Sequence, residues 1–111
     1  MTLADRRFSA ELILRTGKVV PFDDPGCLAA GAAAMAADLI QSLWVADYLV
    51  PDSMTVVDRM VFIRSDSIRT PMGYGIIAVR PGPAADSLAR HIGSPMIRWA
   101  DVVALAQTAG R

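Results

Sequence analysis

Three side chains in the sequence have chemistry that a functional site could use: the single cysteine Cys27, the single histidine His91, and Met72. A thiolate is a nucleophile and a metal ligand, whereas a thioether binds soft Cu(I) and is almost indifferent to Zn²⁺, Mg²⁺ or Ca²⁺. A single cysteine forbids an intrachain disulfide, and one Cys with one His cannot by themselves complete a tetrahedral structural zinc site. Classical zinc binding is therefore not expected.

Cys27 stands three residues after Asp24, in the first turn of a predicted helix. Free backbone N–H groups and the positive end of the helix dipole favour a thiolate at such a position, which makes Cys27 a candidate ligand or nucleophile. The carboxylates of Asp23 and Asp24 oppose that effect. Because a free cysteine is among the residues most often buried, position alone favours a core role.

His91 is the only histidine that could serve as a base for Cys27, and it lies near the end of a different predicted helix. Nothing in the sequence supplies the third group that orients such a base, and a histidine at a helix C-terminus commonly satisfies the dipole at the surface. We therefore expect a surface role for His91, while its proximity to the other candidates stays open.

Met72 lies between Pro71 and Gly73, at the mouth of a predicted strand. Proline fixes the approach of the chain and glycine lets a neighbouring backbone come close, so the thioether would have a defined direction. Methionines mostly fill gaps in cores, and packing is the interpretation that we prefer for Met35, Met54 and Met60. Met72 is therefore a candidate Cu(I) ligand with packing as the alternative.

The first half of the chain predicts a strand hairpin, a helix and a strand. Residues 8–20 read as two strands joined by a turn at Thr16-Gly17. Asp24 suits the N-cap and Pro25 the first helical position of an Ala-rich helix that continues to about Gln41. Residues 43–50 form the next strand, which Pro51-Asp52-Ser53 should end.

The second half predicts the same order of elements. Residues 54–64 and 73–80 form a strand pair around a loop at 65–72, residues 84–91 form a helix capped by Gly93, and 96–99 form a short strand before a final helix over 101–109. The expected fold is α+β, with two small ββαβ units packed together and a C-terminal helix. We expect one domain, residues 1–111, with a pseudo-repeat of 1–52 and 53–111.

Composition limits the partners of this domain. The 111 residues are 53% hydrophobic, and 11 basic residues balance 11 acidic ones without runs of either sign. We therefore expect no nucleic-acid partner and no attraction to an anionic bilayer. No stretch reaches the roughly 18 apolar residues of a membrane span, and the first residues lack the features of a secretory signal.

Four motifs, in this order and spacing, resemble the NosL family, the accessory proteins of nitrous oxide reductase. They are Arg7-Phe8-Ser9-Ala10-Glu11, Phe22-Asp23-Asp24-Pro25-Gly26-Cys27, Trp44-Val45-Ala46-Asp47-Tyr48 and Thr70-Pro71-Met72-Gly73-Tyr74-Gly75-Ile76-Ile77-Ala78. The resemblance covers nearly the whole chain. It implies a copper chaperone rather than an enzyme, one that holds Cu(I) and delivers it during maturation of the copper-sulfur centre of nitrous oxide reductase, in denitrification.

The resemblance also implies the ligands and the compartment. Met72 of the Pro-Met-Gly motif is the first candidate ligand, and Cys27 is the next. Family members usually carry a Cys-x-x-Cys-x-Met motif behind a lipoprotein signal, and Met1 falls where the methionine of that motif should stand. Met1 is therefore a third candidate, and we expect this chain to begin inside the family's sequence.

The resemblance implies a periplasmic or membrane-anchored protein, attached only through a lipid anchor that this sequence does not contain. A chain that truly starts at Met1 would be cytoplasmic.

Two alternatives remain open. In one, Cys27 is the reactive thiol of an enzyme, because the same small fold is similar to the repeated unit of organomercurial lyases; one cysteine is too few for that carbon–mercury chemistry. In the other, the chain is a metal-free interaction module that binds a partner through its Ala-rich helix and exposed aromatic side chains.

Overall fold

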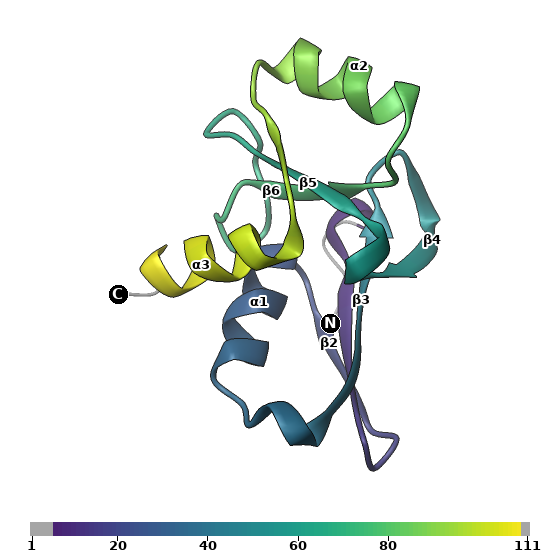
Figure 1. Ribbon diagram of the computed structural model, residues 1–111, viewed down its shortest axis with the longest axis vertical. Helices are drawn as coiled ribbons and strands as arrows, with labels where there is room; N and C mark the ends of the chain where they lie inside the picture. Colours follow the sequence, from purple (N-terminus) through teal and green to yellow (C-terminus); the bar gives the residue numbers. More distant parts are fainter. Residues whose placement is uncertain (1–5, 110–111) are drawn as a thin grey trace.

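Two antiparallel sheets with helices packed between and beside them make up residues 6–109, the part of the chain that the computed structural model describes (Figure 1). The first sheet contains β1 (Ala10–Leu14), β2 (Val19–Phe22), β3 (Ile40–Asp47) and β4 (Val50–Val56), in the order β2-β1-β3-β4. The second contains β5 (Val61–Arg64), β6 (Ile76–Val79) and β7 (Met96–Ile97), in the order β6-β5-β7. The helices are α1 (Pro25–Ala33), α2 (Pro83–Ile92) and α3 (Trp99–Ala109), and short 3₁₀ turns occupy Arg6–Phe8, Ala37–Leu39 and Val57–Arg59.

Both sheets are built by the same chain path. In each, the first strand lies in the middle, pairs antiparallel with the second, and pairs on its other side with the strand that follows a helix. This confirms the predicted α+β class with two ββαβ units and a C-terminal helix. The first sheet has β4 as an additional edge strand, so the predicted repeat boundary between residues 52 and 53 lies inside a strand.

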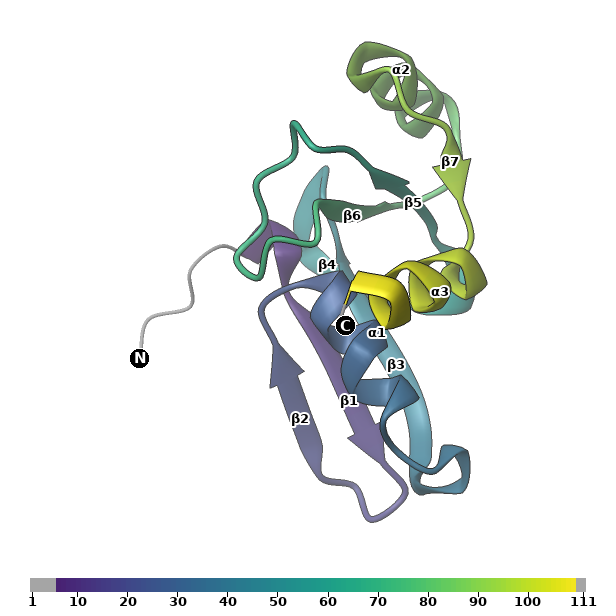
Figure 2. The same ribbon diagram turned by 90° about the vertical axis from the view of Figure 1, so that its left-hand side faces the viewer.

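The core is shared between the two sheets. Helices α1 and α3 pack against each other, α1 on β1 and α3 on β5, and one apolar cluster takes Leu12, Leu28, Phe62 and Val102 from these four elements. Helix α2 lies on the opposite face of the second sheet, where it covers a second cluster that includes Ile63 (Figure 2). Strand β5 is apolar on both faces because its successive side chains point alternately into one cluster and the other.

The first helix is shorter than predicted. It ends at Ala33 rather than near Gln41, and β3 already begins at Ile40. The residues from Ile40 onward pair with β1 on one side, and Trp44 to Asp47 pair with β4 on the other. Sheet hydrogen bonds and burial outweigh the helix propensity of the Ala-rich run, since propensity is easily overridden by tertiary contacts.

The prediction that Pro51-Asp52-Ser53 would end a strand was also wrong. Strand β3 ends at Asp47, the chain turns at Tyr48 and Leu49, and β4 runs through these residues to Val56. Asp47 stabilises the turn because its Oδ1 accepts a hydrogen bond from the backbone N–H of Leu49 at 2.9 Å. Proline is tolerated in β4 because edge strands leave N–H positions that no neighbour needs.

The remaining element predictions fit with local changes. Gly17 (φ +93°) forms the β1–β2 turn and Gly93 (φ +82°) caps α2, both in the left-handed conformation that glycine adopts readily. The strand expected over 54–64 is divided into β4 and β5 by a 3₁₀ turn, and the strand expected over 96–99 stops at Ile97 because α3 begins at Trp99.

Candidate functional site

The carboxylate of Asp24 joins the start of α1 to the loop that carries Met72. Its Oδ1 accepts a hydrogen bond from the backbone N–H of Gly26 at 2.8 Å, as an N-cap does. Its Oδ2 accepts one from the backbone N–H of Met72 at 3.1 Å, although 48 positions separate the two residues. Because Asp24 is fully buried, this bridge fixes the helix terminus and the loop relative to each other.

The loop itself is shaped by local hydrogen bonds. The carbonyl of Thr70 accepts from the backbone N–H of Gly73 at 3.0 Å, and the hydroxyl of Thr70 accepts from that of Gly75 at 3.0 Å. Gly73 has φ +80° and Gly75 has φ +69°. A Cβ on Gly75 would lie 2.6 Å from the carbonyl oxygen of Ser65, so only glycine fits there.

Tyr74 packs the same loop against α1. A Cβ on Gly26 would lie 2.2 Å from Cγ of Tyr74, which means that the tyrosine side chain occupies the space beside the first helical turn. Tyr74 also packs partly buried against the main apolar cluster. The glycine in Phe22-Asp23-Asp24-Pro25-Gly26-Cys27 therefore has a packing role that spacing alone does not reveal.

Cys27 is the third residue of α1 and is half-buried. Burial raises the pKa of its thiol above the ordinary 9.0, and the negative charges of Asp24 and Asp23 raise it further. The expectation that the helix terminus would favour a thiolate is thus outweighed by desolvation and by two carboxylates. At neutral pH the thiol is protonated.

Met72 combines a fixed backbone with an open side chain. Its N–H is held by Asp24, yet its side chain is 57% exposed, although large apolar side chains usually lie inside. Asp24 thus holds the loop that carries Met72 against the first turn of α1, which carries Cys27. A soft metal ion is the cargo that a thioether and a thiolate on neighbouring segments could bind together.

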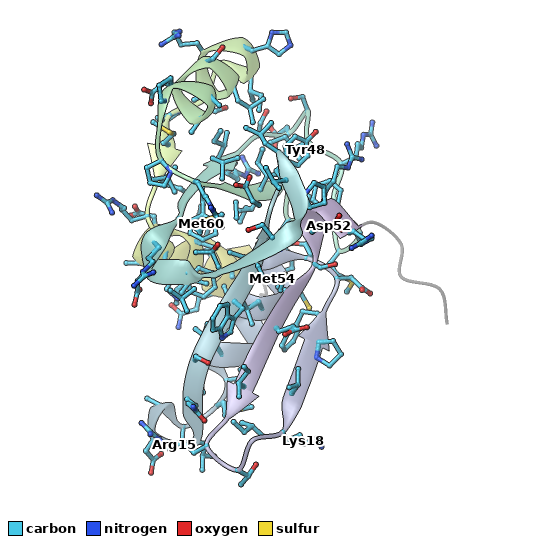
Figure 3. All side chains as sticks on the ribbon, turned by 90° about the vertical axis from the view of Figure 1, so that its right-hand side faces the viewer. Arg15, Lys18, Tyr48, Asp52, Met54 and Met60 are labelled. Carbon is cyan, nitrogen blue, oxygen red and sulfur yellow. The ribbon has the colours of Figure 1, made fainter. Side chains whose placement is uncertain are left out.

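Of the other predicted residues, His91 does not join this site. Met1 lies outside the described residues. His91 is exposed in the last turn of α2, and α2 is separated from α1 by the second sheet (Figures 1 and 2). Met54 and Met60, labelled in Figure 3, belong to the segment from β4 to β5; Met60 is buried in the core, as expected for a packing residue.

Residues 6–109 contain neither a cluster of three metal-binding His, Cys, Asp or Glu side chains nor a membrane-spanning helix. No three His, Cys, Asp or Glu side chains of that part of the chain come together in a group able to hold a metal ion. None of its helices has the length and hydropathy needed to cross a bilayer.

Sequence inspection recognised Asp24 only as a helix cap and missed its contact with Met72. The cap follows from residue type and neighbours, whereas the second hydrogen bond depends on how distant segments pack. Comparisons with known proteins add nothing to the assignment: no protein-family model, curated protein or solved structure matches the chain. The likeness to NosL proteins stays a prediction.

Proposed function

We propose that this chain is a Cu(I) carrier that holds the ion through the thioether of Met72 and the thiolate of Cys27. The observation that supports this proposal is the Asp24 bridge, which accepts from the backbone at Gly26 and Met72 at once. Asp24 is buried, and it fixes the backbone of a methionine whose side chain is exposed and so contributes little to packing. Such an arrangement is expected where the methionine side chain binds a ligand.

Two soft ligands suit transport better than storage. Cu(I) accepts few ligands, and sulfur is the ligand type that selects it over Zn²⁺, Mg²⁺ and Ca²⁺. The open side chain of Met72 leaves the ion accessible to an incoming ligand from an acceptor. The proposed carrier therefore performs ligand exchange and catalyses no reaction.

Binding is coupled to loss of a proton from Cys27. The thiol S–H bond breaks, the sulfur electron pair forms the bond to Cu(I), and the proton passes to solvent. Because the pKa of the thiol is raised, the site is protonated through the neutral range and the apparent affinity should rise about tenfold per pH unit below that pKa. Acid then favours release.

The acceptor follows from the resemblance given above. We infer that the recipient is nitrous oxide reductase or its maturation machinery, in the periplasm, and that Met1 is a further ligand of the kind implied by the family. These parts of the proposal stand on sequence likeness, whereas the pairing of Met72 with Cys27 stands on the hydrogen bonds of Asp24.

A thiol-dependent enzyme is the weaker candidate. An activated cysteine needs a lowered pKa or an adjacent base, and Cys27 has a raised pKa with the histidine on another helix. The thiol of Cys27 is thus protonated until a metal ion displaces its proton, and it lacks the lowered pKa and the adjacent base of a nucleophile.

The ligand set is tested by X-ray absorption spectroscopy of the chain loaded with Cu(I) under anaerobic conditions. Sulfur neighbours only, with one lost in Cys27→Ser and one lost in Met72→Leu, are expected. Met96→Leu is the matched control, because Met96 is also exposed, at 37%, but lies on β7. Nitrogen neighbours, or identical spectra for all variants, would exclude the proposed site.

A further inference from the structure

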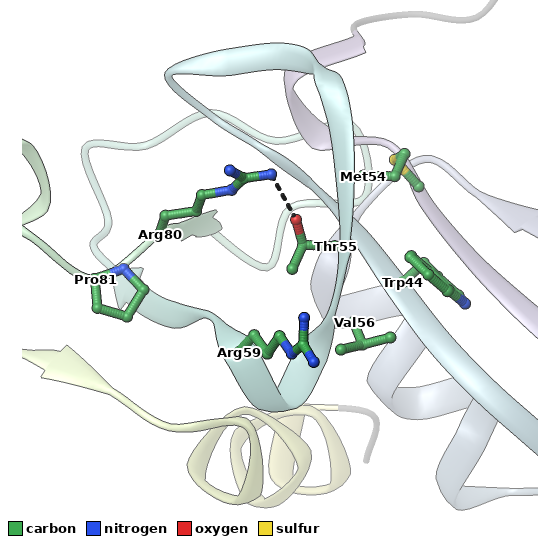
Figure 4. Close-up of a pocket in the computed structure, with 7 residues that line it drawn as sticks. All are labelled: Trp44, Met54, Thr55, Val56, Arg59, Arg80 and Pro81. Carbon is green, nitrogen blue, oxygen red and sulfur yellow. Dashed lines mark hydrogen bonds between the residues drawn. The ribbon is translucent and has the colours of Figure 1, made fainter.

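Strand β4 has an open outer edge beside a large hollow. It is the last strand in the order β2-β1-β3-β4, so no strand pairs with its far side among the described residues. The hollow has a volume of about 620 Å³ and is lined chiefly by Met54, Thr55 and Val56 of β4 together with Trp44, Arg59 and Arg80 (Figure 4).

The hollow runs along the strand edge rather than over one face. Successive side chains of a strand point to opposite faces, and Met54, Thr55 and Val56 are consecutive. In Figure 4, Thr55 points toward Arg80 while Met54 and Val56 lie on the side of Trp44. A space that touches all three must include the edge between the two faces, where backbone N–H and C=O groups are available.

Two guanidinium groups flank this edge. Arg80 is held in place by the hydroxyls of Ser53 at 2.5 Å and Thr55 at 3.2 Å, and its Nε lies 3.8 Å from the buried carboxylate of Asp47. Arg59 makes no hydrogen bond or ion pair with any residue of the described chain. No Asp or Glu lines the hollow, so positive charge dominates it.

We propose that the edge of β4 binds an extended acidic segment of a partner protein by strand addition. The backbone of the segment pairs with β4, carboxylates at alternate positions bind Arg59 and Arg80, and an apolar side chain packs against Trp44. The other edge strand of this sheet, β2, is less suited because Pro21, which lacks an N–H group, lies inside a strand of only four residues. The proline of β4, Pro51, lies near the start of its strand, away from the three residues that line the hollow. The proposal is independent of copper, since it involves neither Met72 nor Cys27.

A random hexapeptide display library, selected on the immobilised chain, tests the proposal directly. The expected sequences alternate Asp or Glu with apolar residues. A synthetic peptide of the enriched sequence should bind at low salt, and N-methylation of alternate amides should abolish binding, because strand addition needs the N–H donors of the peptide.

Charge reversal at the edge provides the second arm. Arg59→Glu should weaken the enriched peptide about tenfold or more, whereas Lys18→Glu, an equal charge change at the exposed β1–β2 turn, should leave its affinity unchanged (Figure 3). Recovery of no acidic pattern, or equal affinity for the Arg59→Glu chain, would overturn the proposal. So would a β4-to-β4 dimer in sedimentation equilibrium that Thr55→Pro dissociates, because the edge would then belong to a second copy.

Discussion

At the scale of single residues, Asp24 connects two segments that carry the candidate ligands. Both of its carboxylate oxygens accept backbone hydrogen bonds, and neither is exposed to water. A buried donor that loses its acceptor costs more than the hydrogen bond itself contributes, because the donor also loses its hydration. The effect of changing Asp24 should therefore exceed that of changing any exposed carboxylate of the chain.

Asp24→Asn should destabilise the fold by about 1–3 kcal/mol. Asparagine offers one acceptor oxygen and one donor group, so either the N–H of Gly26 or that of Met72 then faces another donor. Urea denaturation measures the loss. Asp23→Asn, a half-exposed neighbour, is the matched control and should change stability by less than about 0.5 kcal/mol; equal effects of the two changes would contradict the bridging role.

Cys27 should react slowly with iodoacetamide at pH 8, and faster once the chain is unfolded in urea. The folded pKa lies above 9.0, so at pH 8 the folded chain holds a smaller fraction of thiolate than the unfolded chain does. This difference in pKa stabilises the folded state fully below the unfolded value of about 9, and the stabilisation is lost as the pH rises through the higher folded pKa. Asp23→Asn should speed the folded-state reaction by lowering the pKa, whereas exposed Asp38→Asn should not; a folded thiol faster than the unfolded one would disprove this.

At the scale of elements, the contact between α1 and the Met72 loop is formed by Gly26 and Tyr74. Alanine would normally strengthen a helix by up to about 1 kcal/mol relative to glycine. At position 26 the added Cβ would lie 2.2 Å from Cγ of Tyr74, close to the tyrosine backbone, where little relief is possible. Packing, and not helix propensity, thus decides the residue at this position.

Gly26→Ala should lower the free energy of unfolding by about 1–3 kcal/mol, since overpacking outweighs the gain in propensity. Gly31→Ala in the same helix is the control. Its added Cβ would approach only the tip of the Phe22 ring, at 2.8 Å, and that ring can shift, so we expect a loss below about 1 kcal/mol. The two losses are measured from the midpoints of urea denaturation. An unaltered midpoint for Gly26→Ala would contradict the tight packing of Tyr74 against position 26.

Elements with local signals were predictable from the sequence. Asp24 and Pro25 mark the start of α1, Gly17 and Gly93 mark a turn and a cap, and all four stand where their residue types predict. The ends of α1 and β3 were not predictable, because pairing with β1 and β4 decides them. Hydrogen bonds between distant segments leave no local pattern in the chain.

At the scale of the whole molecule, one cluster of side chains joins both sheets. Leu12 comes from the first sheet, Phe62 from the second, and Val102 from the C-terminal helix that packs on both α1 and β5. The two ββαβ units therefore share their largest apolar contacts. Helix α1 of the first unit packs on α3 and β6 of the second unit as well as on β1 of its own.

Unfolding should therefore be a single cooperative transition. The variants Trp44→Phe and Trp99→Phe each leave one tryptophan, the first beside Phe62 of the second sheet and the second in β3 of the first sheet. The fraction of unfolded chain that each tryptophan reports should follow the same dependence on urea, once the difference in stability between the two variants is subtracted. Two separated midpoints would mean that the units unfold independently.

The candidate site could be predicted only in part. Residue type and position single out Cys27 and Met72, because Cys27 is the one cysteine of the sequence and Met72 lies between proline and glycine. Their connection could not be predicted, since it depends on a buried carboxylate reaching across the fold. Arg59 and Arg80 could not be predicted as a pair either, because neither belongs to a distinctive motif and only the fold brings both to the hollow beside β4.

The central claim is that Cu(I) binds at the loop held by Asp24. An anaerobic competition titration against a chromogenic Cu(I) chelator, run on the parent chain, Met72→Leu, Cys27→Ser and Met96→Leu, tests it most directly. The parent and Met96→Leu should each retain one Cu(I) per chain, with an affinity that rises with pH, while the other two variants lose most of it. Retention that is the same in all four chains, or absent from the parent, would contradict the account.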